Sequence, residues 1–397
     1  MKKSIFFFTI ILFTLTVQAQ KSKIVGSWLM TKVETAEGVQ EPYFITNFKD
    51  DGSMEVMGIP VGTWKYDEGS KSIVMNSKMD KDFNGPAKIE KLTKTNLVVT
   101  RDGVKMYYDR VDRKEIETNN LKLPVEGVWH GKNENGGEVF LKFTAPDSLL
   151  VLSTGDGSID RAHSRWLYYP KDKSMIIMGF SRLLRGKCNV DISGDKLSMD
   201  FGNNKQLSFT KEPEIKVERL TYKEDEFPEE SPDESKLPWI EGGTDRLITV
   251  LEPVKELKFR RGVWLPDVGV FLYTTLVSKI KVNPDDMSVV YTNLSIDNGD
   301  TMQYSQNVKG ELQNSYNNFF PFEDIYLYRV TGKEKIKVPA GEFDCTVVEG
   351  IDGDAKVKLW MIDQMPGVYA KIIRDEPDPF GDINYIVKEL TSVEKRK

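Results

Sequence analysis

Histidine and cysteine are scarce in this chain of 397 residues, which holds two of each. His130 and His163 stand far apart, without an acid or a cysteine at a recognisable catalytic spacing. Two histidines are too few for a histidine-rich metal centre, and Cys188 and Cys345 alone cannot form a zinc cage. The sequence also lacks a glycine-rich phosphate loop, a Gly-x-Ser-x-Gly nucleophile elbow and a His-Glu-x-x-His pair. We therefore expect a protein that is not an enzyme and that has no catalytic residue, metal site or cofactor.

Carboxylates are the remaining candidates for chemistry, and the loops richest in them are 156–160, 352–354 and 375–382. None of these loops has the alternating acids and the closing Glu of a calcium-binding loop. Because Asp and Gly are the ordinary residues of hairpin tips, we interpret the three loops as turns. A carboxylate-dependent hydrolase stays as an alternative, and it would need two acids about 5–10 Å apart in a cleft.

Blocks of basic residues and long apolar runs are also missing from most of the chain. The formal net charge of −6 becomes −8 when Lys2 and Lys3 are removed. An acidic protein without a basic patch has no electrostatic footprint for nucleic acid or for an anionic membrane surface. After the first residues, no stretch is long and apolar enough to cross a bilayer, so we expect no transmembrane segment.

Residues 1–19 have the order of a secretory signal peptide. Two lysines precede an apolar stretch over 5–15, and Val17-Gln18-Ala19 is a small-residue cleavage site. The apolar stretch is too short for an uncleaved spanning anchor. We predict cleavage after Ala19 and a periplasmic or secreted protein that starts at Gln20. An intact mass that includes Met1 would contradict this prediction.

An exported protein can form disulfides, but the two cysteines lie in apolar, strand-like contexts. We therefore expect Cys188 and Cys345 to be buried free thiols.

An internal repeat sets the organisation of the chain. Three pairs of landmarks keep nearly the same spacing: Trp28 and Trp129 are 101 residues apart, Trp64 and Trp166 are 102 apart, and Lys71 and Lys173 are 102 apart. A register held over three landmarks indicates the duplication of a domain.

The boundaries of the domains follow from composition. The two copies cover 20–112 and 125–212, with a polar connection between them. An acidic linker is expected over 213–238, because residues 224–234 contain seven acids and no base. A C-terminal β domain is expected over 239–397.

Alternation of apolar and polar residues with a period of two is found throughout, and helical periodicity is nearly absent. Each copy contains about eight short strands, enough for a closed antiparallel barrel that has room for one small ligand at most. We predict an all-β protein with two small antiparallel barrels in tandem, followed by a curved antiparallel sheet.

The first copy resembles the short lipocalin-like domains of exported bacterial proteins. The resemblance rests on the Gly-x-Trp opening at Trp28, on Gly62-Thr63-Trp64-Lys65-Tyr66, and on Arg110 near the last strand. In that family the first Trp plugs one end of the barrel. The second copy has Ser208-Phe209-Thr210-Lys211 in place of the terminal Arg. The resemblance therefore does not decide whether the second barrel is closed.

Four aromatic residues in the middle of the two copies are the candidate ligand-binding residues. Trp64 shares a strand face with Tyr66, and Trp166 shares one with Tyr168. They either line a cavity for a small apolar molecule such as a lipid or fill the barrel cores. For Trp28 and Trp129 we favour a place in the barrel floor.

The C-terminal region shows strands over 271–282, 288–296, 325–330, 335–349, 356–362 and 366–372. The string from Val338-Pro339-Ala340-Gly341 to Pro366-Gly367-Val368 resembles envelope proteins with a curved, half-open sheet of the lipoprotein-carrier type. In those proteins helices close the concave face, which accepts acyl chains. The candidate for such a lid here is Gly310 to Phe320, whose Asn-rich composition disfavours a helix.

Our leading hypothesis is an exported, non-enzymatic protein that binds a small apolar or amphipathic ligand. The alternative is a scaffold whose barrels are filled and whose surface pairs with another protein of the cell envelope. An open barrel interior would favour the first hypothesis, and a filled interior would favour the second.

Overall fold

The structure is a computed structural model, and the residues that it describes lie between 21 and 396. Its gaps are 78, 80, 82–83, 156–157, 180, 182, 203, 228–242, 284, 286–287, 298–299, 309–324, 326 and 378–382. The expected signal peptide and the candidate lid at 310–320 lie outside the described residues. The chain divides into two compact units, Met1–Glu212 and Pro213–Lys397. In the described part of the chain, no helix has the length and apolar character needed to cross a membrane.

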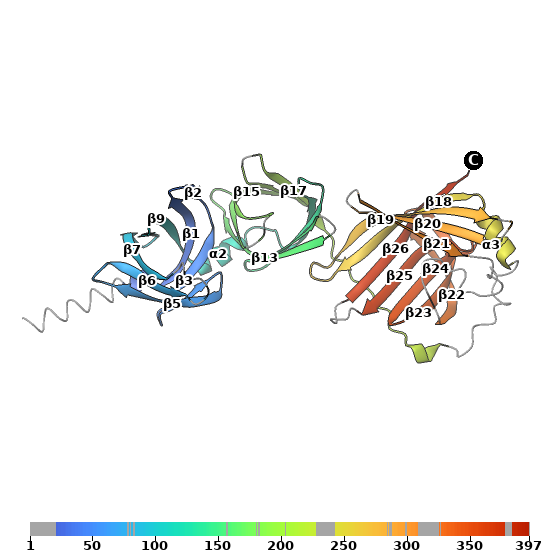
Figure 1. Cartoon of the computed structure of the whole chain (residues 1–397), viewed down its shortest axis with the longest axis horizontal. Helices are drawn as coiled ribbons and strands as arrows, with labels where there is room; N and C mark the ends of the chain where they lie inside the picture. The colour runs from blue at the N-terminus through green and yellow to red at the C-terminus, as the bar shows by residue number, and fades with distance from the viewer. Residues whose placement is uncertain are drawn as a thin grey trace, which may run out of the picture. The chain divides into compact units, whose positions relative to one another are not determined.

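The first copy forms a closed barrel of eight antiparallel strands, in which β1 pairs with β9 and the short β2 is added beside β1 (Figure 1). The strands are β1 (Gly26–Thr35), β2 (Gly38–Gln40), β3 (Phe44–Phe48), β4 (Ser53–Val56), β5 (Ile59–Asp67), β6 (Ser72–Ser77), β7 (Gly85–Leu92), β8 (Asn96–Arg101) and β9 (Val104–Val111). Asp102 and Gly103 join the last two strands with φ angles of 48° and 80°, which is the geometry of a tight two-residue hairpin.

The second copy forms a closed antiparallel barrel in which β10 pairs with β17. Its strands are β10 (Gly127–Lys132), β11 (Glu138–Thr144), β12 (Ser148–Gly155), β13 (Ser158–Tyr169), β14 (Ser174–Gly179), β15 (Gly186–Ser193), β16 (Lys196–Asp200) and β17 (Gln206–Glu212). The repeated landmarks Lys71 and Lys173 have φ angles of 49° and 50°, so the duplication extends to the backbone conformation. Two closed barrels confirm the predicted fold class.

The same tryptophan plugs the floor of each barrel. Trp28 and Trp129 are fully buried, and the indole Nε1 of each donates to a carbonyl oxygen four residues earlier, at 2.7 Å. Arg110 lies over the ring of Trp28, 4.6 Å from its centre, and Lys211 lies over Trp129 at 5.6 Å. A cation on the last strand therefore covers both rings, and Lys211 takes the place of the missing Arg.

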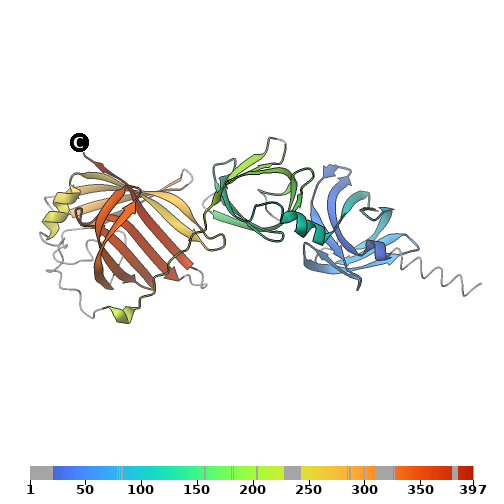
Figure 2. The same cartoon turned by 180° about the vertical axis from the view of Figure 1, so that it is seen from behind.

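A short helix, α2 (Arg113–Asn120), connects the two barrels within the first unit (Figure 2). The side chain of Asp112 caps its N-terminus by accepting from the backbone N–H groups of Lys114 and Glu115. At the other end Asn120, 2% exposed, donates from Nδ2 to the carbonyl oxygens of Pro146 and Trp166 and accepts from the N–H of Tyr168. The connection is therefore part of the packed structure of the first unit.

Apolar side chains on the outside of the barrels bury this junction. Ile176 and Met178 of β14 pack in one cluster with Leu29 and Ile45 from the first barrel. The alternate residues of β14, such as Ile177, face the interior of the second barrel. Burial on both faces explains why Ser174–Gly179 is apolar almost throughout rather than alternating.

Replacing Asn120 with alanine should lower the free energy of unfolding of the first unit by about 1–3 kcal/mol. The substitution leaves the buried N–H of Tyr168 and two carbonyl groups without their partner. Chemical denaturation would measure the change, and Asn119→Ala, at the neighbouring half-buried position of the same helix, is the matched control. Equal stability of the two variants would contradict the role given to Asn120.

The second unit contains one curved antiparallel sheet of nine strands in the order β21-β20-β19-β18-β26-β25-β24-β23-β22 (Figure 1). Its elements are η2 (Glu224–Glu226), α3 (Gly243–Leu251), β18 (Val254–Leu265), β19 (Val270–Asn283), β20 (Ser288–Asp297), β21 (Asp300–Val308), β22 (Leu327–Val338), β23 (Gly341–Asp352), β24 (Ala355–Ile362), β25 (Tyr369–Pro377) and β26 (Ile383–Lys395). The curved sheet predicted for this region is confirmed.

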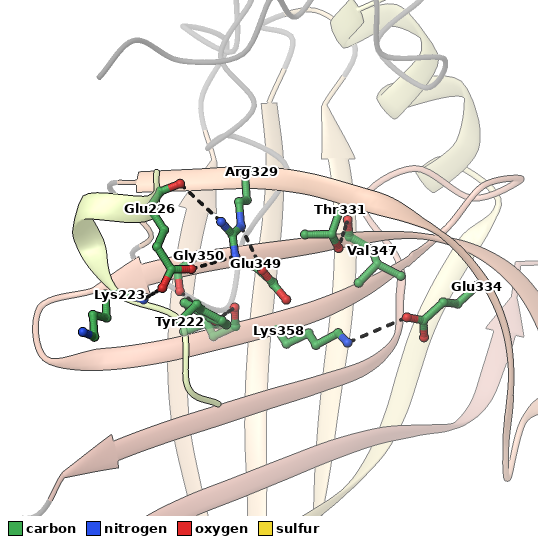
Figure 3. Close-up of polar contacts among 11 residues, drawn as sticks. Tyr222, Lys223, Glu226, Arg329, Thr331, Glu334, Val347, Glu349, Gly350 and Lys358 are labelled. Atoms are coloured by element: carbon green, nitrogen blue, oxygen red, sulfur yellow. Dashed lines mark hydrogen bonds and ion pairs between the residues drawn. The ribbon is translucent and has the colours of Figure 1, made fainter. Parts of the chain in front are cut away.

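Residues 213–227, which the composition places at the start of the acidic linker, lie against this sheet, and we call them the strap. The hydroxyl group of Tyr222, which is buried, lies 2.7 Å from the carbonyl oxygen of Val357 and 3.1 Å from that of Gly350. Arg329 binds Glu349 and reaches the carbonyl oxygen of Glu226, so it connects the strap to the sheet (Figure 3). The strap is thus part of the second unit, and the rest of the expected linker lies outside the described residues.

Candidate functional site

The four predicted ligand residues lie in two separate barrel interiors. Trp64 is 4% exposed and belongs to the core of the first barrel, and Tyr66 is half-buried against that core. Trp166 and Tyr168 are 3% and 8% exposed and belong to the core of the second barrel. The structure therefore brings the residues together as two pairs and not as one site.

Each of the two tryptophans is packed by side chains of its own barrel. The ring of Trp64 meets Phe48 edge-on, with 5.2 Å between ring centres. Trp166 meets Phe143 in the same way at 5.6 Å. Phe48 and Phe143 are equivalent, since each stands opposite the glycine that opens its repeat. The two tryptophans are thus packed against side chains of their own barrels, as in other small barrels.

The two copies differ in how they satisfy the indole N–H groups. Trp64 donates from Nε1 to the carbonyl oxygen of Lys49 at 2.9 Å. Among the residues that the structure describes, Trp166 Nε1 and the neighbouring hydroxyl of Ser164 are buried without a hydrogen-bond partner. The second core therefore holds two polar groups whose burial is not compensated.

This difference predicts unequal effects of one substitution. Trp64→Phe removes a part-buried hydrogen bond, while the Lys49 carbonyl keeps the backbone N–H of Gly52 as a donor, so the loss should be about 0.5–1.5 kcal/mol beyond the loss of ring volume. Trp166→Phe removes an unpartnered N–H and should cost less. Denaturation of the two variants under the same conditions would compare them. A larger loss for Trp166→Phe would contradict the bonding found here.

Neither cysteine has the environment of a nucleophile. Cys188 and Cys345 are buried and free, as predicted. Burial raises the pKa of each thiol to about 12, so both stay protonated at neutral pH.

His130 lies on the outer face of the second barrel between two carboxylates. Its Nε2 is 2.6 Å from Glu138 and its Nδ1 is 3.1 Å from Glu212, while its ring stacks on Phe140. These contacts link β10 to both neighbouring strands, including the strand that closes the barrel.

His163 is exposed on β13. In the described part of the chain, no three or more His, Cys, Asp or Glu side chains are placed to hold a metal ion.

Several carboxylates of the acid-rich loops form ion pairs. Asp352 pairs with Arg374, and Asp375, with a side chain 1% exposed, pairs with Arg219 of the strap. The acids at 156, 378 and 382 lie outside the described residues.

A concave site lies where the two barrels meet, and we call it the inter-barrel cleft. Its volume is about 210 Å³, and its walls come from α2, the end of β9, β3 of the first barrel and β13 of the second. It is lined by Ile45, Val111, Arg113, Ile116, Glu117, Pro146, Asp147, Arg165 and Leu167. The lining combines five apolar residues with four charged residues of both signs, and Arg165 is bound to Asp147 at 3.2 Å.

The size of the cleft decides what can fill it. Pockets for drug-sized ligands span roughly 300–1,000 Å³, whereas a cavity of about 150 Å³ holds a single benzene ring. The inter-barrel cleft is therefore suited to one large apolar side chain rather than to a lipid.

Sequence reasoning missed this cleft because its residues come from both copies and from the connection between them. The usable signal was the strand Ser174–Gly179, which is apolar on both faces. In an isolated barrel the outer face of this strand would be exposed to solvent, whereas here it packs at the junction.

No known protein family matches the chain, and no curated protein matches it. Weak likenesses to solved structures exist. A chain of the MucA/MucB complex from Pseudomonas aeruginosa is 14% identical with a TM-score of 0.23, and the match covers 38% of this chain and 55% of that one. A protein of unknown function of the DUF3598 family from Nostoc punctiforme is 9% identical with a TM-score of 0.18 and coverages of 71% and 99%. The first match spans little more than half of the other chain, and scores of this size carry no argument about fold or function.

Proposed function

We propose that this protein is an exported, non-enzymatic interaction module whose two filled barrels form a rigid platform for a partner protein. The observation that carries the proposal is the contrast between barrel interiors occupied by their own side chains and an open cleft at the barrel junction. This contrast favours the scaffold over a carrier that holds an apolar ligand inside a barrel.

The cleft has the features of a pocket for an anchor residue. Protein interfaces concentrate their binding energy in a few buried side chains that fill well-formed pockets surrounded by a polar rim. Here Leu167 and Ile116 belong to a rigid apolar cluster, while Arg113 and Glu117 are exposed at the edge. One apolar side chain of a partner would fill the cleft, and the charges would orient the segment that carries it.

Site-specific crosslinking tests the proposal. A photoreactive amino acid at Glu117 should give a crosslinked protein adduct in the organism of origin. The same group at Lys114, exposed on the same helix but absent from the cleft, should give much less. Equal yields at the two positions, or no protein adduct at Glu117, would overturn the proposal.

A further inference from the structure

The exposed side of α2 carries charges of both signs beside the inter-barrel cleft. Arg113 and Glu117 stand one helical turn apart at the edge of the cleft and are both exposed. In the part of the chain that the structure describes, neither side chain forms an ion pair or a side-chain hydrogen bond. The other two charged residues of the cleft, Arg165 and Asp147, are already paired with each other.

An exposed leucine follows on the same helix. Leu121, the C-cap residue of α2, has helical backbone angles and is 71% exposed. It comes one turn after Glu117 and therefore lies on the same side of the helix. An exposed apolar side chain on the helix that borders a cleft of about 210 Å³ provides both an anchor and a receptor on one surface.

We propose that the partner received by the inter-barrel cleft is a second copy of this chain, docked by antiparallel pairing of the two α2 helices. This inference rests on the proposed function and names its partner. Two-fold symmetry requires that if residue i contacts residue j of the partner, then j contacts i. Antiparallel helices satisfy this condition with Arg113 of each copy opposite Glu117 of the other.

The same arrangement places the leucine anchor. When the helices cross between positions 113 and 117, Leu121 of one copy lies beyond the N-terminal end of the other α2. Val111 lines the cleft just before that end, and Ile45 belongs to the same apolar cluster. The charges and the anchor are therefore compatible with one geometry.

The contact is small, so the dimer is transient. Stable interfaces bury about 1,200–2,000 Å² in total, whereas one helix and one cleft on each copy offer less. The self-association therefore depends on protein concentration in the micromolar range or above.

Exchanging the charges at positions 113 and 117 tests the proposed pairing, because the double variant restores the dimer only if the two side chains contact each other across it. Arg113→Glu places a glutamate opposite Glu117 of the other copy, and Glu117→Arg places an arginine opposite Arg113 of the other copy. Each single variant should raise the dimer dissociation constant about tenfold, and the double variant should return it to within about threefold of the parent. Leu121→Ser should also weaken the dimer. Lys114→Glu makes the same change of charge as Arg113→Glu away from the cleft and is the control.

Analytical ultracentrifugation of the full mature chain over a range of concentrations measures these constants. Rescue by the double variant, with Lys114→Glu unchanged, supports the inference. A parent that stays monomeric at every concentration, or a double variant as weak as the single ones, overturns it. A monomeric parent that still gives a crosslinked adduct to a different protein at position 117 would leave the proposed function standing and remove only the second copy as its partner.

Discussion

Replacing Arg219 with leucine should lower the free energy of unfolding of the second unit by about 3 kcal/mol. The side chain of Asp375 is 1% exposed, and both of its carboxylate oxygens lie within 2.8 Å of the Arg219 Nε. The backbone N–H of Leu220 donates to the same carboxylate at 2.9 Å. Without the arginine, the buried carboxylate loses its ion pair and keeps the hydrogen bond from the Leu220 N–H. We expect the lower end of the range for broken buried ion pairs because Arg219 itself is 42% exposed.

Hydrogen exchange of the full chain would localise this loss, which should appear in β24, β25 and the strap. Arg260→Leu is the matched control, since Arg260 and Glu389 form an ion pair on the same sheet in which both side chains reach solvent. That control should cost no more than about 1 kcal/mol. Asp375→Asn in the Arg219→Leu background should recover part of the loss by removing the buried charge. If Arg219→Leu and Arg260→Leu have the same effect, the strap is not anchored as described.

Replacing Trp166 or Trp64 with alanine should lower the free energy of unfolding of the first unit by about 3–5 kcal/mol each. Both rings are at least 96% buried and contact a phenylalanine of the same core, so their loss leaves a cavity that a closed barrel cannot collapse. Denaturant titration would measure the change. Tyr273→Ala, at a ring 45% exposed on the second unit, should cost far less. A loss below about 1 kcal/mol for either tryptophan would show that its ring is not part of the packed core.

The barrels could be predicted because their signals are local and occur twice. The alternation of apolar residues, the hairpin turn at Asp102-Gly103 and the spacing from Trp28 to Trp129 each specify short-range structure. The closure of the second barrel was harder to predict, since the sequence shows a lysine where the resemblance expects an arginine. The structure shows that Lys211 still places a cation over Trp129.

The junction and the strap could not be predicted because their stabilising contacts are distant in sequence. Helix α2 is polar, and the residue that fixes it, Asn120, bonds to backbone groups 26 to 48 residues away. Arg219 finds its carboxylate 156 residues later. The acid-rich composition from 224 onward predicts a linker. It does not show that the preceding residues contact Asp375 or that Tyr222 covers one face of the sheet.

The claim that the barrels are filled is tested by the uptake of a fluorescent fatty acid. Uptake and melting temperature are measured for the parent protein and for the Trp64→Ala and Trp166→Ala variants. If the barrels are filled, both substitutions lower the melting temperature. At temperatures where the variants stay folded, each variant then takes up as much fatty acid as the parent does. If either substitution abolishes a saturable uptake and leaves the melting temperature unchanged, the ring lines a ligand cavity and the account of filled barrels is wrong.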